Sequence, residues 1–285
     1  MNTTDVKAIT EQLETGLSEM FTSERYREYL SFMSRFHSYS VNNVVLILLQ
    51  HPTAGMVAGY KTWEKMGRHV KRGEKAIRIL APCPFKRTVT REITENGVTT
   101  SEEQEVVIPR YKAVSVFADD QTEGKDIPEL VAGPLTGTVD SYETILEALK
   151  DVAGIPVGFE DIQGGALGYF NRQDNRIAIK TGLSELQTVK TLIHEIAHSI
   201  LHNEQQSKIR PVDKDTKEVE AESVAYTVAT ALGLDTSDYS FGYIAGWSQG
   251  REMKAVRASM DVVRKTASDI IDKLESAMQA EEIAA

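Results

Sequence analysis

The stretch TLIHEIAHSILH, residues 191–202, decides how the C-terminal half of this chain is interpreted. His194 and His198 are four residues apart, so on a helix both imidazoles project from one face, where they can bind one zinc ion. Glu195 follows about 100° further round the helix, where it can take a proton from a water on the open side of the metal. The alternative is a buried helix that carries its histidines by coincidence, and a third ligand would distinguish the two.

The segment EVEAESVAY, residues 218–226, supplies the predicted third ligand. Glu218 and Glu222 are four residues apart and share a helix face, whereas Glu220 points elsewhere. We predict that Glu218 binds the zinc ion and that Glu222 accepts the outer N–H of a ligand histidine. For all three glutamates the alternative is a solvated acidic face.

His202 is predicted not to bind the metal. It lies a second turn beyond His198 in the same row of one helix, and three residues in one row cannot surround a single ion. We interpret it as a polar residue that ends the helix. Because Cys83 is the only cysteine, any metal site must depend mainly on histidine and carboxylate, and a reducing compartment is indicated.

Residues 59–91 form a basic segment, although the net charge of the whole chain is −10. This segment holds ten Lys or Arg and two Glu, a net charge of +8. Its first part, GYKTWEKMGRHVKRGEKAIRIL, combines basic side chains for phosphates with aromatic rings for unpaired bases, which suits single-stranded nucleic acid. The alternative is a solvated charged face with one core tryptophan.

Periodicity and turn signals predict two domains of α+β class. Helices over the first fifty residues and short strands after them form a domain at residues 1–120. Residues 121–140 are rich in Gly, Pro, Thr and Asp and are predicted to be a linker. Residues 141–285 form the second domain, which ends in a helical extension. The longest apolar run, Val44–Leu49, is too short to span a bilayer, so we predict a cytoplasmic protein without a membrane partner.

TLIHEIAHSILH followed by EVEAESVA resembles the zinc metallopeptidase domain of the ImmA/IrrE type, a reduced gluzincin-like fold, over about residues 142–234. The resemblance implies one Zn²⁺ ion and a protein or peptide substrate, which could add as a strand beside GYFNRQDNRIAI. It assigns the third ligand, the Glu of an E-x-x-A-[DN] pattern, to Glu218; the Asp or Asn of that pattern is Glu222 here, which is a departure. Glu195 would be the general base in water attack on a peptide carbonyl. The candidates to assist the oxyanion are Tyr169, Tyr226, Tyr239 and Tyr243.

YSVNNVVLILLQHP, the start of the basic segment and AVSVFADDQTEG resemble the N-terminal domain of the ArdC antirestriction family, over about residues 10–125. This resemblance implies binding of single-stranded DNA and a role in antirestriction, or in the transfer or establishment of DNA carried by plasmids and conjugative elements. The residues that the matched segments place near DNA are Arg35, Asn43, Lys61, Trp63, Arg68, Lys71, Arg72, Lys75 and Arg78.

The leading hypothesis is therefore a single-stranded-DNA-binding domain followed by a zinc metallopeptidase domain. One alternative is a DNA-protecting protein whose zinc has only a structural role. Another is a regulatory peptidase that cleaves a repressor.

Overall fold

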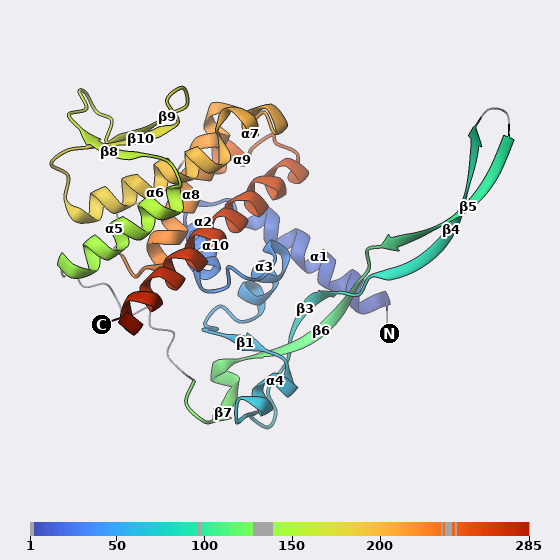
Figure 1. Ribbon diagram of the computed structural model, residues 1–285. Helices are drawn as coiled ribbons and strands as arrows, with labels where there is room; N and C mark the ends of the chain where they lie inside the picture. The colour runs from blue at the N-terminus through green and yellow to red at the C-terminus, as the bar shows by residue number, and fades with distance from the viewer. Residues whose placement is uncertain are drawn as a thin grey trace. The chain divides into compact units, whose positions relative to one another are not determined.

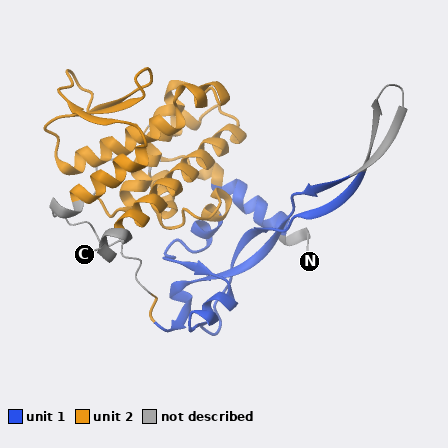
Figure 2. Cartoon of the chain, viewed as in Figure 1, with its two compact units in different colours: residues 1–16, 46–125 blue, residues 17–45, 126–285 orange. Residues whose placement is uncertain are grey.

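The computed structural model describes residues 3–95, 98–127, 139–234, 236, 241–242 and 244–284. The chain divides into two compact units (Figure 2): residues 1–16 with 46–125, here the first unit, and residues 17–45 with 126–285, the second unit. Each unit contains both helices and β-strands, which confirms the predicted α+β class with two domains.

The division into units does not follow the order of the sequence. Residues 17–45 belong with the C-terminal unit, whereas the sequence predicted domains at 1–120 and 141–285. In the second unit α2 (Ser23–Arg35) packs on α8 (Lys214–Ala231), and Tyr26 Oη lies 2.9 Å from Ser223 Oγ. Of the predicted linker, residues 121–140, the part at 128–138 lies outside the described residues.

The first unit holds a small antiparallel sheet that continues into a long two-stranded ribbon (Figure 1). The strands are β1 (Val57–Ala58), β2 (Arg68–Val70), β3 (Ile77–Pro82), β4 (Phe85–Glu95), β5 (Val98–Ile108), β6 (Tyr111–Ala118) and β7 (Thr122–Gly124). The helices are α4 (Tyr60–Lys65), the 3-10 turn η1 (Asp119–Gln121), and parts of α1 (Thr3–Glu19) and α3 (Val41–Gln50), which the two units share. Strand β6 pairs with β1 and β3, β2 pairs with β7, and β4 pairs with β5 to make the ribbon.

Alternation along β3 and β6 gives their sheet one buried face. Ile77 and Ile79 on β3 are buried, as is Val116, which lies opposite Ile77. Because successive side chains point to opposite faces, Arg78 and its partner Ser115 lie on the other face of the same sheet.

The second unit places a three-stranded sheet against a group of helices (Figure 1). Its strands are β8 (Val157–Glu160), β9 (Gly168–Asn171) and β10 (Arg176–Lys180); β10 lies between the others, parallel to β8 and antiparallel to β9. Besides α2 and α8, its helices are α5 (Val139–Ala153), α6 (Glu185–Leu201), α7 (Glu204–Ile209), α9 (Ile244–Ser248) and α10 (Met253–Ala284). No helix among the described residues has both the length and the apolar character that crossing a membrane requires.

Helix α8 is the centre of the second unit. It packs against α2, α6, α9 and α10, so side chains are buried around most of its circumference. Even the charged residue Glu220 is fully buried. The helix therefore has a fixed rotation, and this rotation fixes the direction of each of its glutamates.

Asp213 begins α8 as its N-cap: its Oδ1 accepts a hydrogen bond from Thr216 N at 2.8 Å, and its Oδ2 lies 2.8 Å from Arg251 Nη1. The hydrogen bond from Arg251, followed by the bond from Thr216, lowers the pKa of this carboxyl to about 2. We expect Asp213→Ala to lower the free energy of unfolding by about 1 kcal/mol at pH 7, which urea denaturation would measure.

The pH dependence of this loss has a definite sign. The folded-state pKa of Asp213 lies below its ordinary value of 3.8, so its stabilisation is fully present above that value and is lost as pH falls towards about 2. The difference between the wild type and Asp213→Ala should therefore shrink between pH 5 and pH 2. Asp213→Asn is the control, because asparagine also caps helices but does not titrate. Equal stability of Asp213→Ala and the wild type at pH 7 would show that the cap contributes nothing.

Candidate metal centre

Helix α6 holds both predicted histidine ligands. Ser184 Oγ caps the helix by accepting a hydrogen bond from Gln187 N, and the helix packs against β9, β10 and α8. Leu192, Ile193 and Ile196 are fully buried, so they anchor the helix in the core. His194 and His198 remain partly exposed on another side of the helix.

The structure brings His194, His198 and Glu218 together. The Nε2 atoms of the two histidines are 3.0 Å apart, and Glu218 Oε2 lies 3.7 Å from the first and 3.6 Å from the second. Three ligands at about 2.1 Å from a tetrahedral zinc ion would be roughly 3.4 Å from one another. The three atoms therefore fit a single divalent ion, and they are the one such group found among the described residues.

Glu195 lies beside these ligands and is almost completely buried. Burial raises the pKa of its carboxyl, although the nearby His194 and His198 and a hydrogen bond from the Phe170 backbone oppose the shift. Its side chain lines two adjoining cavities of about 270 and 550 Å³. Glu195 can therefore reach a molecule bound in either cavity.

The larger cavity lies between α6, α8 and the edge strand β9. Its lining consists of the three candidate ligands and Glu195, of Gly168, Tyr169, Phe170 and Arg172, and of Lys214 and Lys217. Within the described residues β9 pairs only with β10, so its other edge is available to an extended chain.

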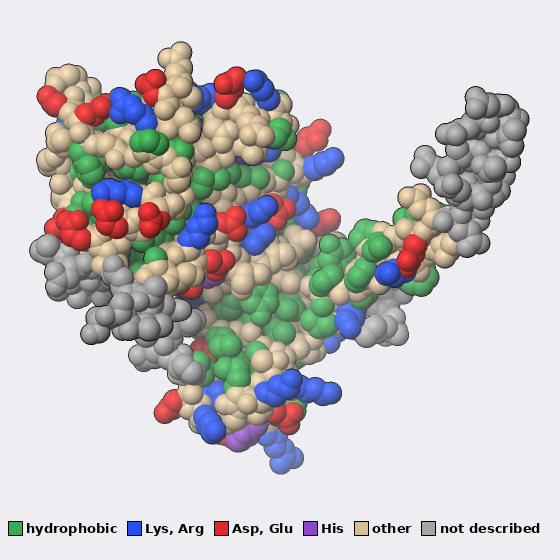
Figure 3. Space-filling view, viewed as in Figure 1, with side chains coloured by type: hydrophobic (Ala, Val, Ile, Leu, Met, Phe, Trp, Pro, Cys, Tyr) green, Lys and Arg blue, Asp and Glu red, His purple; other side chains and the backbone are tan. Residues whose placement is uncertain are grey.

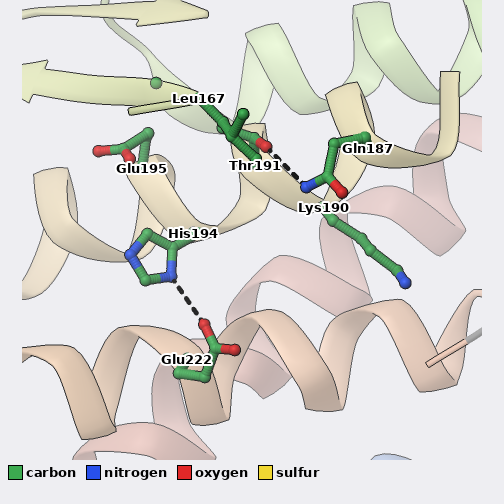
Figure 4. Close-up of a pocket in the computed structure, with 8 residues that line it drawn as sticks. Leu167, Gln187, Lys190, Thr191, His194, Glu195 and Glu222 are labelled. Atoms are coloured by element: carbon green, nitrogen blue, oxygen red, sulfur yellow. Dashed lines mark hydrogen bonds and ion pairs between the residues drawn. The ribbon is translucent and has the colours of Figure 1, made fainter. Parts of the chain in front are cut away.

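Glu222 stands behind His194, as Figure 4 shows: its Oε2 lies 3.2 Å from His194 Nδ1, the ring nitrogen that does not face Glu218. Burial lowers the pKa of His194, but Glu222 and the neighbouring glutamates outweigh this effect, so the net pKa is raised. The pKa of the Glu218 carboxyl is lowered, chiefly because of its hydrogen bond with His198.

The structure constrains the tyrosines proposed to assist an oxyanion. Tyr169 lies in the wall of the larger cavity, but its hydroxyl donates to Glu160 and accepts a hydrogen bond from Arg176 at 3.0 Å. Tyr226 is buried against Phe241, with ring centroids 5.4 Å apart. Tyr239 and Tyr243 lie outside the described residues.

One residue that the sequence placed outside the site, His202, contacts it, and Glu220 contacts His202 in turn. His202 Nδ1 lies 3.0 Å from His198 Nδ1, and His202 Nε2 lies 3.0 Å from Glu220 Oε2. Glu220 points away from the face shared by Glu218 and Glu222, as predicted, but it is buried and faces α6 and α10, so the alternative of a solvated acidic face is wrong for this residue. His202 continues the four-residue spacing of the ligands, and that spacing was the available signal for its contact with His198.

The prediction that Trp63 lies at the DNA-binding surface is wrong. Its side chain is fully buried, and its Nε1 donates to the Phe117 carbonyl at 3.0 Å, so its ring cannot stack on a base. Asn43 is also buried, and both Asn43 and the exposed Arg35 belong to the second unit rather than to the unit that holds the basic segment.

The remaining basic residues of the predicted set lie in the first unit. Arg68 donates to Thr122 Oγ1 at 2.9 Å, Lys71 Nζ to Asp120 O at 2.8 Å, and Arg78 to Ser115 Oγ at 3.0 Å. These contacts fix the direction of three of the cations. The exposed members of the set in this unit are Lys61, Lys71, Arg72 and Lys75.

Two family models match the chain. The N-terminal domain of anti-restriction factor ArdC matches residues 4–117, and the IrrE N-terminal-like domain of peptidase family M78 matches residues 150–240. The chain is thus similar to an ArdC-type domain in its N-terminal part and to an IrrE-type domain in its C-terminal part. The IrrE-type match contains His194, Glu195, His198 and Glu218, and the ArdC-type match contains the basic segment. Both resemblances seen in the sequence are thus confirmed.

One curated relative matches most of the chain. The uncharacterized protein pXO2-81 of Bacillus anthracis is 28% identical over 309 residues, an alignment that covers 95% of this chain and 51% of that protein. The chain therefore spans about half the length of this curated relative.

Two solved structures of the antirestriction ArdC protein from the R388 plasmid share the fold. The metal-free form has a TM-score of 0.51 at 21% identity and covers 85% of this chain and 86% of its own. The Mn(II)-bound form has a TM-score of 0.50 at 20% identity and covers 84% of each chain.

Proposed function

We propose that this is a cytoplasmic protein in which an ArdC-type domain binds single-stranded DNA and an IrrE-type domain is a zinc-dependent metallopeptidase. Its role would be antirestriction, or the transfer and establishment of mobile DNA. The observation that carries the peptidase part is the triangle formed by His194, His198 and Glu218, beside a buried Glu195 in a cleft. In this proposal the predicted domain at residues 1–120 carries the DNA-binding activity and the predicted domain at residues 141–285 carries the peptidase activity, and residues 17–45 pack in the second unit beside the peptidase residues.

The donor set suits a divalent ion that takes part in hydrolysis. Two imidazoles and one carboxylate are the protein ligands found in hydrolytic zinc sites, which leave a position open for water. The related R388 protein has been solved with Mn(II), which supports a divalent ion at this fold. When bound, such an ion acts as a Lewis acid on water and on a carbonyl oxygen.

Glu195 performs the proton transfers in this proposal. Its carboxylate receives the proton of the attacking water and then delivers it to the nitrogen of the leaving amine. The raised pKa of this carboxyl suits a group that must both accept and release a proton. An extended peptide would bind along the free edge of β9 and place its scissile bond over Glu195.

The reaction is tested by a search for new protein N-termini in cells that express the wild-type chain. We expect cleavage products that are absent when Glu195→Gln is expressed at the same level. If the two cell populations have the same set of N-termini, the peptidase assignment is wrong.

Exposed aromatic rings in the first unit support the DNA-binding part. Tyr60, Phe85 and Tyr111 are 50%, 48% and 59% exposed, and the Arg110 guanidinium lies over the Phe85 ring at 5.7 Å. By alternation Tyr111 shares the sheet face that carries Arg78. Figure 3 shows hydrophobic side chains gathered on the ribbon of β4 and β5. These rings replace the buried Trp63 as the proposed surface on which bases stack.

The triple substitution of Tyr60, Phe85 and Tyr111 by alanine should weaken binding to an oligothymidine. Each stacked base contributes about 1–3 kcal/mol, so the loss should exceed roughly tenfold, measured by fluorescence anisotropy. Affinity of the wild type should also fall steeply between 50 and 200 mM salt. Phe159→Ala is the matched control, because this aromatic ring is 44% exposed but lies in the second unit. Equal affinities for the triple variant and the wild type would remove these rings from the DNA surface.

A further inference from the structure

A row of buried polar side chains continues behind the ligand His198. Its Nδ1 lies 3.0 Å from His202 Nδ1, and His202 Nε2 lies 3.0 Å from Glu220 Oε2. The Arg210 guanidinium donates to both oxygens of Glu220, with Nη1 at 2.8 Å from Oε1. His202 is 1% exposed and Glu220 is 0% exposed, so water does not compete for these contacts.

The chemistry at each end of the row sets the direction of its hydrogen bonds. His198 Nε2 faces His194 and Glu218, so it must be free of a proton to bind an ion, and the ring proton is then on Nδ1. An ionised Glu220 can only accept, so it holds the proton of His202 on Nε2. His202 Nδ1 is then an acceptor, and it faces the Nδ1–H of His198.

Glu220 can remain charged in this position because it has several donors. Burial opposes its ionisation, but His202 Nε2 lies 3.0 Å from its Oε2 and the Arg210 guanidinium donates to both of its oxygens, so the charge is paired inside the protein. A paired guanidinium with two parallel hydrogen bonds is the arrangement that best offsets the cost of a buried carboxylate. The carboxylate of Glu220 is costly to bury, and the row of contacts that starts at Glu220 ends at His198. A role for Glu220 at His198 would account for its burial.

We propose that His202 and Glu220 are positioning residues that fix the tautomer and ring orientation of His198 and so strengthen metal binding. The inference rests on the metal site of the proposed function. The two ligand histidines are then supported in different ways, His194 by the carboxylate of Glu222 and His198 by an imidazole that Glu220 orients. Partners of this kind change metal affinity by about 10–100-fold when they are removed.

A matched pair of substitutions at His202 tests the proposal. His202→Leu fills the space but offers no acceptor, whereas His202→Asn places a carbonyl oxygen near the position of the imidazole Nδ1. Both lose the contact with Glu220, so they differ mainly in the hydrogen bond to His198. We expect the zinc dissociation constant, measured by competition with a chelator, to rise about 10–100-fold in His202→Leu and by less than about tenfold in His202→Asn.

Thermal melting of the metal-free proteins shows whether each variant folds. A second measurement, on the wild type, applies even if His202→Leu does not fold: ¹⁵N NMR of the zinc-loaded protein should show a scalar coupling across the hydrogen bond between His198 Nδ1 and His202 Nδ1. The absence of this coupling, or equal zinc affinity in folded His202→Leu and the wild type, overturns the proposal. A protein that binds zinc with these differences but cuts no peptide would contradict the peptidase function and leave this inference intact.

Discussion

Glu195→Gln is expected to lower the rate of peptide cleavage by at least about 10²-fold while the zinc content of the protein stays unchanged. Glutamine keeps the size and the polar contacts of the side chain but cannot accept the proton of the attacking water. The ion should remain because His194, His198 and Glu218 form the site without Glu195. The measurements are cleavage kinetics on a substrate identified by its new N-terminus, and metal analysis of both proteins.

The same variant separates the peptidase from the two alternatives raised by the sequence. A DNA-protecting protein with a structural ion would keep its full biological activity when Glu195 becomes glutamine. A regulatory peptidase would lose activity, and the protein with the new N-terminus would be a repressor. Binding of single-stranded DNA should be unchanged in the variant, because Glu195 lies in the second unit and the proposed DNA surface in the first.

Helical spacing alone predicts the pair of histidines in the candidate metal site. Residues four apart share a face whatever surrounds the helix, so His194 and His198 could be paired before any tertiary contact was known. Glu218 required one more step, the packing of a second helix against the first, and the resemblance to a known family assigns the same residue. The structure brings these three residues together as that step requires.

The sequence did not predict which of the polar and aromatic side chains are buried. Glu220 resembles a surface residue by type, and only the packing of α2, α6 and α10 around α8 turns it inward. Trp63 lies in a basic segment, but its burial and its hydrogen bond depend on Phe117, which is 54 residues further along the chain. The assignment of residues 17–45 to the second unit also depends on contacts between residues far apart in the sequence, because Tyr26 contacts Ser223, 197 residues further along the chain. Local patterns do not encode such distant pairs.

Glu218→Ala is expected to remove the ion and leave the fold in place. The wild type should contain about one zinc per chain, and the variant almost none after dialysis against metal-free buffer, because two imidazoles alone do not complete a site of this kind. Structural zinc sites use four protein ligands, whereas the group found among the described residues has three and opens onto a cleft. Circular dichroism of the variant should therefore match that of the wild type.

Glu143→Ala is the control for this experiment, because Glu143 is an exposed carboxylate on α5 of the same unit. It should keep the full zinc content. If Glu218→Ala also keeps its zinc, the ion is bound elsewhere and the metal centre proposed on α6 and α8 is wrong. If the variant loses both zinc and its helical signal, the ion stabilises the fold as a structural site does, and the open cleft beside Glu195 would need another explanation. Retention of the fold without the ion is the result that favours a hydrolytic centre, since a structural zinc ion contributes folding energy and its loss would unfold the protein around it.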